Sequence, residues 1–174
     1  MPIDGCHRTF DELARVVLPA YMARLRERMA APTPLSDFSI KGRGVAALKE
    51  QLGLAGDPRG CYVLMEGDRP VYVGISKHLV ARLMEHVRGT DHLTATLVYR
   101  VAAMRNPHGM TAANAMKDEA FLRKFDEARS YLRDLNVAFV EIDNPLELYV
   151  FEPYCALELD TSFDAGGWNS FDTH

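Results

Sequence analysis

The sequence predicts an α+β fold, in which helices flank a small and mostly antiparallel sheet of about three strands. Two β-prone runs, residues 61–65 and 71–75, are separated by a five-residue segment whose glycine and proline favour a hairpin turn. A third apolar run, residues 137–142, has the length and composition of a buried strand. Most of the other segments carry apolar residues at helical intervals, so we expect helices to cover this sheet.

The first 58 residues are predicted to form a helical extension before the main domain. Thr9 and Glu12 have the spacing of a capping box, and the apolar residues that follow predict a helix from about residue 10 to 30. Pro19 lies inside this helix and should kink or divide it, because proline lacks a backbone N–H. A short helix is expected over residues 45–54. The sequence thus divides into an extension, residues 1–58, and a domain, residues 59–174.

The helices of the domain follow from their apolar spacing and end signals. Ser76 is expected to cap a helix that runs to about Arg88 and ends at Gly89. Residues 93–104 fit a strand or a helix, with helix favoured, and another helix is predicted over residues 115–132. Pro145 suits the first turn of a last helix that extends to about residue 159.

Charge is distributed unevenly along a chain whose formal net charge is −4. Residues 59–105 carry seven Lys or Arg and four Asp or Glu, whereas residues 134–174 carry nine acidic residues and no Lys or Arg. The net charge argues against a protein that coats nucleic acid through bulk electrostatics. The basic strip has two interpretations, an ordinary solvated surface or a phosphate-facing surface beside a metal-binding carboxylate.

Cysteine usage and hydropathy indicate the cellular compartment. Three widely spaced cysteines, Cys6, Cys61 and Cys155, give neither a disulfide framework nor a Cys-x-x-Cys metal site. The start of the chain lacks the features of a signal peptide, and no segment has about 18 uninterrupted apolar residues. We therefore expect a cytoplasmic protein that does not associate with membranes.

Two tripeptides on the predicted hairpin carry a family resemblance. Gly60-Cys61-Tyr62 is followed, ten residues after its tyrosine, by Tyr72-Val73-Gly74. The pattern continues with Arg82, His86, Glu152 and Asn169. This combination resembles the GIY-YIG nucleases, with Cys61 where an aliphatic residue is usual, and it covers about residues 60–174. The resemblance implies a metal-dependent phosphodiester hydrolase, with these two tyrosines and four other residues as its catalytic set.

The chemistry of phosphodiester hydrolysis gives the two tyrosines and the basic helix their expected tasks. Tyr62 or Tyr72 would hold or deprotonate the attacking water, and the sequence leaves open which of them is the general base. Arg82 and His86 are four residues apart, so they should share a helix face and grip one phosphate. This face is predicted to lie opposite the apolar stripe of Leu79.

Glu152 is the metal ligand that the resemblance implies, holding Mg²⁺ or Mn²⁺ together with waters and substrate oxygens. The residues around Glu152 are apolar, so its carboxylate is expected to point towards the sheet. Glu147 and Glu158 compete for this role, and the spacing to Cys155 favours Glu152. Asn169 either fixes the local backbone or contacts a substrate phosphate.

The favoured function is therefore a metal-dependent endonuclease that acts on nucleic acid, with DNA preferred over RNA as the substrate. The alternative is a catalytically weak or inactive domain of the same fold that acts as a protein- or nucleic-acid-interaction module, which the net charge of −4 favours. The intact set of candidate residues favours the enzyme. No zinc finger or helix-turn-helix pattern indicates how a particular substrate would be selected.

Overall fold

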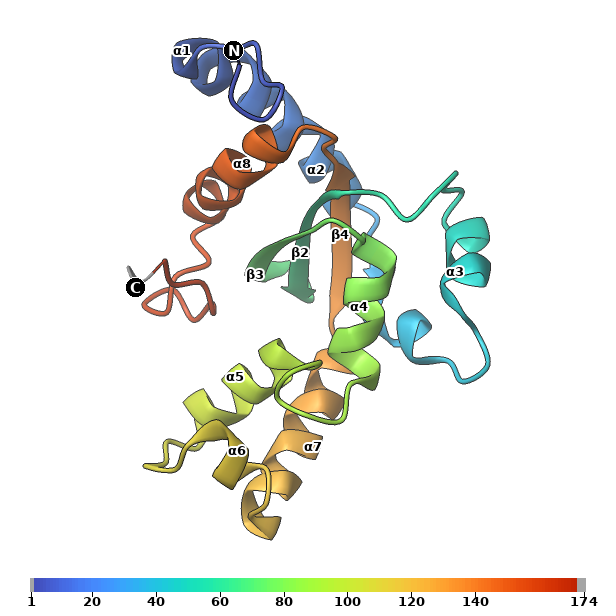
Figure 1. Cartoon of the computed structure of the whole chain (residues 1–174), viewed down its shortest axis with the longest axis vertical. Coiled ribbons are helices and arrows are strands. Elements are labelled where there is room, and N and C mark those ends of the chain that lie inside the picture. Colours follow the sequence, from blue (N-terminus) through green and yellow to red (C-terminus); the bar gives the residue numbers. More distant parts are fainter. Residues whose placement is uncertain (1, 172–174) are drawn as a thin grey trace.

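The computed structural model describes residues 2–171, and its strands form one antiparallel sheet in the order β1-β4-β2-β3 (Figure 1). The four strands are β1 (Thr33–Pro34), β2 (Gly60–Glu66), β3 (Arg69–Ser76) and β4 (Asn136–Glu141). The α+β class is confirmed, but the expected number of about three strands is wrong because β1 adds a fourth. A two-residue strand that contains a proline has no alternating pattern, so the sequence gives no signal for it.

The hairpin predicted from the two β-prone runs is present as β2 and β3. Its tight turn leaves Gly67 with a φ of 60°, a left-handed conformation that glycine adopts at little cost. The register places Tyr62 opposite Gly74 and Leu64 opposite Tyr72, and it shifts between Leu64 and Met65. Because β4 pairs with the other side of β2, Tyr62 lies on the central strand of the sheet.

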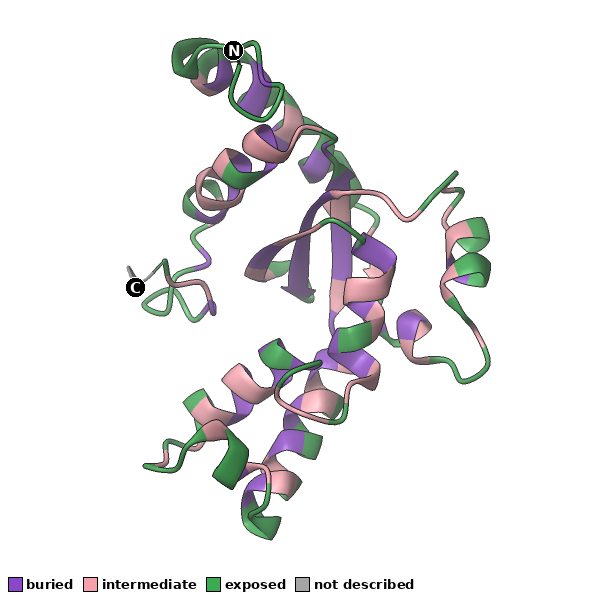
Figure 2. Cartoon of the chain, viewed as in Figure 1, coloured by how far each residue is buried: buried purple, intermediate pink, exposed green. Residues whose placement is uncertain are grey.

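Helices cover both faces of the sheet (Figure 1). On one face, α2 (Leu18–Met29) and α8 (Pro145–Glu158) bury residues such as Val63 and Val140. On the other face, α4 (Leu79–Arg88) packs over Tyr62 and Leu64, with α3 (Val45–Gln51) beside it. Figure 2 shows that β2, between the two layers, is almost wholly buried. The sheet therefore has two separate apolar cores, one on each face.

The predicted N-terminal helix is continuous but contains a wider turn. Its parts are α1 (Phe10–Glu12), a π-helical turn over Leu13–Val17, and α2. The capping box between Thr9 and Glu12 is formed as expected. Pro19 is the second residue of α2, two residues after the π turn ends, where the wider backbone spacing accommodates a residue that cannot donate a hydrogen bond.

The N-terminal segment supplies part of the main core. Leu18, Met22 and Leu25 of α2 belong to the same buried cluster as Val73 and Phe151. A 3₁₀ helix over Leu35–Ser39 follows β1 and buries Phe38 in the opposite core. Residues before 59 therefore complete the covering of the sheet on both of its faces.

Helices α5 (Thr96–Arg105), α6 (Ala112–Ala115) and α7 (Glu119–Arg133) form a lobe at one end of the sheet (Figure 1). The helix favoured for residues 93–104 is thus confirmed as α5. Asp118 accepts a hydrogen bond from the Phe121 backbone N–H and so caps α7. Phe121 and Phe125 then anchor this lobe in the core beneath α4.

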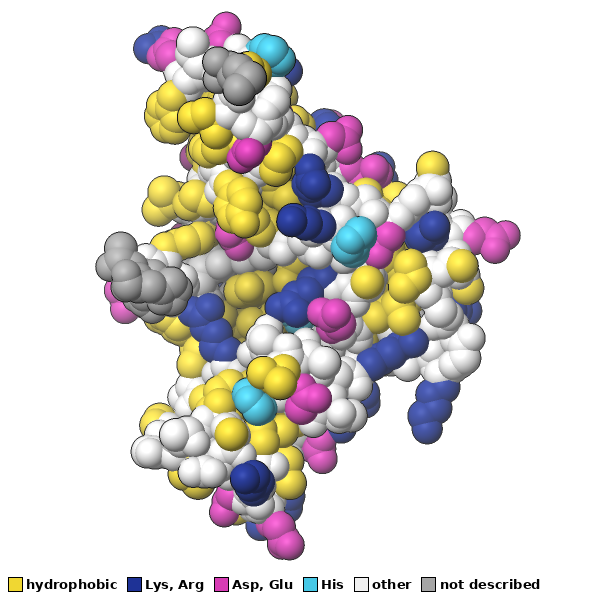
Figure 3. Space-filling model, in the orientation of Figure 1, with side chains coloured by type: hydrophobic (Ala, Val, Ile, Leu, Met, Phe, Trp, Pro, Cys, Tyr) yellow, Lys and Arg dark blue, Asp and Glu magenta, His cyan; other side chains and the backbone are white. Residues whose placement is uncertain are grey.

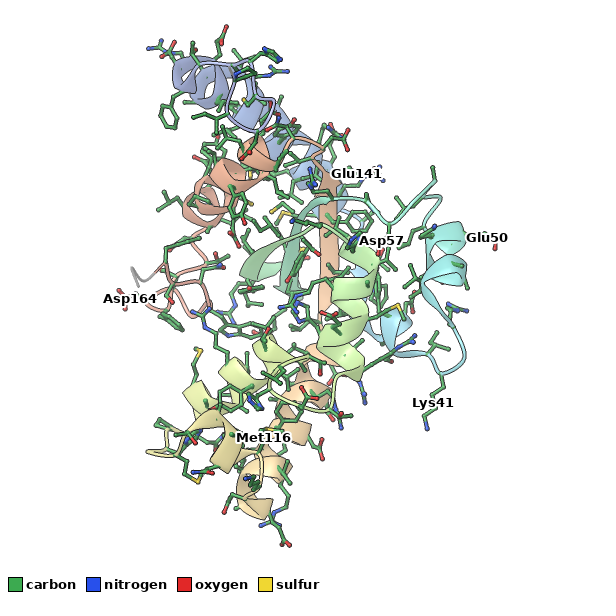
Figure 4. The ribbon with its side chains drawn as sticks, viewed as in Figure 1. Lys41, Glu50, Asp57, Met116, Glu141 and Asp164 are labelled. Carbon is green, nitrogen blue, oxygen red and sulfur yellow. The ribbon has the colours of Figure 1, made fainter. Side chains whose placement is uncertain are left out.

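The first turn of α4 is capped from a distance. Asp57 accepts hydrogen bonds from the backbone N–H groups of Val80 at 2.7 Å and Ala81 at 3.2 Å, and Figure 4 shows Asp57 beside the start of this helix. Ser76 instead bonds the backbone of His78, so its predicted capping role is wrong. Asp57 precedes Val80 by 23 residues, so a capping pattern that considers only neighbouring residues could not identify it. The helix ends at Gly89, as predicted.

None of the helices within residues 2–171 is both long and apolar enough to cross a membrane.

Candidate active site

The two tyrosines of the candidate site lie side by side on β2 and β3. Their ring centroids are 6.1 Å apart, with the ring planes inclined by 53°. Gly74 makes this arrangement possible, because a Cβ atom there would lie 2.6 Å from the Tyr62 phenol oxygen and 2.9 Å from the Tyr72 ring. The glycine of the second tripeptide is therefore needed for steric reasons, independently of any chemistry.

Gly60, the glycine of the first tripeptide, is also confined. A Cβ atom at this position would come within 2.2 Å of the Val140 carbonyl oxygen on β4 and 2.8 Å of the Leu79 side chain on α4. Glycine thus allows β4 and the start of α4 to approach the beginning of β2. Both glycines place the strands and α4 close enough for the polar side chains to meet.

Tyr62 forms a buried hydrogen bond to His86, with 2.7 Å between its Oη and the His86 Nε2. Tyr62 is only 1% exposed and His86 is fully buried. The prediction that His86 lies on the face of α4 opposite Leu79 is therefore wrong, since His86 points to the sheet. Burial, reinforced by the nearby Arg82 charge, lowers the pKa of His86 to about 3, so its ring is neutral at physiological pH.

The other ring nitrogen of His86, Nδ1, has no hydrogen-bond partner although it is buried. An unpartnered N–H in this position would cost more than an unpartnered lone pair, which favours the tautomer that carries its proton on Nε2. In that tautomer His86 donates to the Tyr62 oxygen. His86 then acts on Tyr62 as a neutral hydrogen-bond donor.

Arg82 lies at the border between this buried pair and solvent. Its guanidinium donates to Glu85 Oε2 at 2.9 Å and to Thr96 Oγ1 at 2.7 Å. Burial and the neighbouring Tyr72 phenol raise the pKa of Tyr62 well above its ordinary value, and Arg82 opposes this rise. The structure therefore brings Arg82, His86 and Tyr62 together, as the sequence predicted, but buries two of the three.

Tyr72 is the point on which charged side chains from different elements converge. Burial raises the pKa of Tyr72, the Glu152 carboxylate raises it further, and the positive charges of Arg100 and Arg82 lower it. These groups come from α8, α5 and α4 respectively. Unlike Tyr62, Tyr72 is only partly buried. A molecule from solvent can therefore reach Tyr72 more readily than Tyr62.

Arg100 was not among the residues singled out from the sequence. It lies on α5, in the lobe inserted between α4 and β4, and donates a hydrogen bond to Ser170 Oγ at 2.6 Å. Its guanidinium also lies 5.5 Å from the centre of the Phe163 ring. Figure 3 shows dark blue Lys or Arg side chains in the hollow between α8 and α5. The only sequence signal for Arg100 was the excess of basic residues over acidic ones in residues 59–105. That Arg100 lies near Tyr72 depends on the fold, so the sequence alone could not show it.

Glu152 differs from its two competitors because it has no ion pair or hydrogen bond among the described residues. Glu147 is buried and accepts a hydrogen bond from Tyr21 at 2.6 Å. Glu158 pairs with Arg26 at 3.3 Å. Glu152 is half-buried, and burial raises its pKa above the ordinary value. Of the three glutamates, only Glu152 holds a carboxylate that lacks a compensating partner.

Glu152 offers a single carboxylate, which a hard cation that keeps most of its waters could use as a ligand. Within residues 2–171 no three His, Cys, Asp or Glu side chains gather closely enough to hold a metal ion by themselves. A single carboxylate with an oxygen-rich ligand shell completed by water and substrate is the kind of site that Mg²⁺ occupies. The unpaired Glu152 is compatible with that arrangement, whereas a zinc site would need more protein ligands.

Asn169 serves the backbone of β3. Its Oδ1 accepts from the Val73 N–H at 2.7 Å, and its Nδ2 donates to the Val73 carbonyl oxygen at 2.8 Å. The same Oδ1 also accepts from Thr161 Oγ1 at 2.8 Å. Of the two roles left open for Asn169, the structure shows the fixing of local backbone. Its amide is occupied on both sides, so we assign it no contact with a phosphate.

Comparison with known proteins gives no further guide to this arrangement: family models, curated proteins and solved structures were each searched, and none matches the chain.

Proposed function

We propose that the chain is a metal-dependent phosphodiester hydrolase of the GIY-YIG type that cleaves DNA. The observation that carries this proposal is the convergence of Arg82, Arg100 and Glu152 on the partly exposed Tyr72. Two cations and one unpaired carboxylate around a phenol are the groups that phosphodiester cleavage needs, because negative charge must be neutralised while an oxygen nucleophile is activated.

Of the two tyrosines, Tyr72 is proposed to meet the substrate. Tyr62 is 1% exposed, so its oxygen has no access to an incoming phosphate or water. Tyr72 is partly exposed and lies within the electrostatic influence of both arginines, whose charges favour its phenolate form. In this assignment Tyr72 orients or deprotonates the attacking water. Tyr62 packs beside the Tyr72 ring, and His86 holds Tyr62 through their hydrogen bond, so both act as positioning residues.

Arg82 and Arg100 are proposed to bind the phosphodiester. Arginine offers several fixed donors to the non-bridging oxygens and stays protonated at any pH of interest. Arg82 is held by Thr96 and Glu85, and Arg100 is held by Ser170, so both guanidinium groups are already positioned before substrate arrives. Binding therefore costs little side-chain ordering at this site.

Glu152 is proposed to hold the divalent cation, Mg²⁺ or Mn²⁺. When bound, such a cation supplies Lewis-acid stabilisation of the charge that develops on the phosphate and the leaving oxygen. The task of Glu152 is to provide an anionic ligand at the edge of the hollow near Tyr72. Its incomplete burial leaves room for the waters and substrate oxygens that complete the ligand shell.

The alternative, an inactive domain that only binds other molecules, makes a different prediction. If the arginines and Glu152 served only to bind, nucleic acid would be retained without cleavage in the presence of any divalent metal. The unpaired Glu152 favours the enzyme, because a half-buried carboxylate without a partner is costly unless it has a task.

The deciding experiment uses labelled single- and double-stranded DNA and RNA, incubated with the purified chain and Mg²⁺, Mn²⁺ or EDTA. We expect metal-dependent cleavage of DNA, which Glu152→Gln reduces by at least about a hundredfold because the cation loses its only protein carboxylate. Glu158→Gln is the control and should keep most of the activity. If no substrate is cut in any metal, the proposal fails; if RNA alone is cut, the substrate class is wrong.

Metal binding can also be measured without cleavage. Mg²⁺ should raise the melting temperature of the wild type and of Glu158→Gln, because a ligand that binds only the folded state stabilises it. The melting temperature of Glu152→Gln should not respond. Without metal, Glu152→Gln should be as stable as the wild type or more stable at neutral pH, since it removes an uncompensated charge. An equal metal response in all three proteins would exclude Glu152 as the ligand.

A further inference from the structure

The outer edge of β4 has backbone groups that no strand pairs. β1 covers only Val137 and Asn136 of this strand. The backbone N–H of Ile142 bonds to the Arg59 carbonyl on the β2 side, and the Leu135 carbonyl accepts from Leu35 on the β1 side. Because these directions alternate along an antiparallel strand, Phe139 and Glu141 direct their N–H and C=O groups outward. Beyond β1, the described chain places no strand against them.

A groove runs along this open edge. It has a volume of about 310 Å³, and its floor is formed by residues 137–141 of β4. Arg24, Glu27 and Arg28 of α2 form one wall, and Leu52 and Leu54, after α3, contribute to the other. Figure 4 labels Glu141 at the end of β4 that lies farthest from α5. A strip of unpaired backbone between two walls has the shape required by one additional strand.

The opposite edge of the sheet is covered at its middle. On β3, the Val71 carbonyl accepts a hydrogen bond from the Trp168 backbone N–H at 2.8 Å, and the Asn169 amide bonds both backbone groups of Val73. The C-terminal segment thus satisfies the outward carbonyl of Val71 and both outward backbone groups of Val73. Exposed strand edges are sites where other chains pair, and proteins usually block them. The contrast within one sheet singles out the β4 edge.

We propose that the β4 edge binds an extended peptide segment of a partner protein, which adds to the sheet as a strand in line with β1. Its main chain would exchange hydrogen bonds with Phe139 and Glu141, as in other complexes formed by strand addition. The groove fits this class of ligand because only an extended backbone offers donors and acceptors at the spacing of a strand.

The two walls specify which side chains this segment carries. Ala138 and Val140 face the core that includes α2, whereas Phe139 packs on the opposite core. Peptide residues opposite Phe139 and Glu141 would therefore point towards Leu52 and Leu54, and we expect them to be apolar. The residues between them would point towards α2.

Charge on the α2 wall favours acidic residues at these alternate positions. Arg24 and Arg28 form no ion pair within residues 2–171, and the single acidic residue on this wall, Glu27, leaves a net charge of +1. Carboxylates on the incoming segment would complement this wall and select its register. The expected segment therefore alternates apolar and acidic residues.

This inference does not depend on the proposed nuclease activity. The β4 edge and Tyr72 lie apart in the sheet, because β2 separates β4 from β3, the strand that carries Tyr72. Variants of Arg24 and Arg28 should therefore leave cleavage of DNA unchanged. Failure of peptide binding would overturn this inference alone, and absence of cleavage would overturn only the proposed function.

The probe is a fluorescein-labelled peptide, Thr-Val-Asp-Val-Asp-Val-Thr, titrated against the full chain and followed by fluorescence anisotropy. N-methylation of the three valine amides should weaken binding at least about tenfold, because the valine amides opposite Phe139 and Glu141 donate to β4. N-methylation of the two aspartate amides is the matched control and should have a much smaller effect. Equal effects of the two modifications would overturn the proposed pairing.

Two further measurements identify the surface. In the double variant Arg24→Glu/Arg28→Glu, binding should fall at least about tenfold, and a peptide with lysine in place of aspartate should bind better than the original. Hydrogen exchange at the Phe139 and Glu141 amides should slow on addition of the peptide. If these amides are protected only at high protein concentration without peptide, the occupant is a second copy of this chain, and the partner proposal is wrong.

Discussion

The side-chain amide of Asn169 pairs with the backbone of Val73 as a neighbouring strand would, through one accepted and one donated hydrogen bond. Asn169 is 96 residues away from Val73 in sequence, and the pairing holds the C-terminal segment against β3. The neighbouring Trp168 is buried, and its backbone N–H donates to the Val71 carbonyl of the same strand. Asn169 therefore supports the wall of the candidate active site, although its amide is not free to act there.

Replacing Asn169 with alanine should destabilise the fold by about 2–3 kcal/mol, because two backbone groups of β3 and the Thr161 hydroxyl lose their partner. Urea denaturation measures this loss. The substitution Asn169→Asp provides a sharper test, since at neutral pH its carboxylate would face the Val73 carbonyl oxygen. Protonation restores a donor, so the difference from wild type should shrink between pH 7 and about pH 4.

The control for that substitution is Asn114→Asp, at an exposed position in α6. This variant should remain close to the wild type at both pH values. If Asn169→Asp behaves like the control, the paired geometry of Asn169 and Val73 makes no net contribution to stability.

Gly74→Ala should disturb both tyrosines at once. The new methyl group would lie 2.6 Å from the Tyr62 oxygen and 2.9 Å from the Tyr72 ring, so at least one ring must move. We expect a destabilisation of about 1–3 kcal/mol, typical of overpacking, together with a loss of cleavage greater than the loss of folded protein. Gly56→Ala is the control, since nothing lies within 4 Å of a Cβ atom there. Unchanged melting temperature in Gly74→Ala would refute the close packing.

His86 should make the protein less stable as the pH falls. Its pKa is lowered from 6.5 to about 3 in the folded state, so the unfolded chain binds a proton that the folded chain does not. The stabilising contribution is complete above pH 6.5 and is lost as the pH falls towards 3, at up to about 1.4 kcal/mol per pH unit. Urea denaturation from pH 7 to 4 should show a smaller slope in His86→Gln than in the wild type.

The matched control for this pH dependence is His78→Gln, because His78 is exposed at the start of the same helix. It should retain the slope of the wild type. The pH profile of DNA cleavage gives a second test. Because the pKa of His86 is about 3, the wild type should show no step near pH 6.5 that His86→Gln removes. Such a step would mean that His86 exchanges protons with solvent during the reaction.

Arg100→Gln should weaken binding of DNA and reduce its dependence on salt. Each phosphate contact releases about one counterion, so loss of Arg100 should lower the slope of log K against log salt by about 1. Arg82→Gln should have a similar effect. Arg123→Gln, an exposed change on α7, is the control and should leave the slope unchanged. A slope that is equal in all three variants would place the DNA elsewhere on the protein.

Local patterns predicted the elements that local interactions determine. The hairpin, the end of α4 at Gly89 and the start of α8 at Pro145 all follow from residues close together in sequence. β1 was missed, because Thr33 and Pro34 form a strand only through their pairing with Val137 and Asn136. Likewise, the capping of α4 by Asp57 depends on a loop that the fold brings back to the helix.

The candidate site shows the same division. Helical spacing placed Arg82 and His86 on one turn, and strand pairing placed Tyr62 beside Tyr72. The prediction for His86 misread the helical spacing. His86 follows Leu79 by seven residues and Leu83 by three, so periodicity places it on their buried face, where its ring meets Tyr62. Arg100 could not be identified without the fold, since α5 belongs to an inserted lobe.

The asymmetry between the two sheet edges limits how many chains can assemble through strand pairing. A sheet with two open edges can add subunits at both sides and grow into a fibre. Here Trp168 and Asn169 block the β3 edge at Val71 and Val73, so within residues 2–171 strand pairing is directed to the β4 edge. Such an assembly has a fixed stoichiometry: growth by this route ends once one strand has been added.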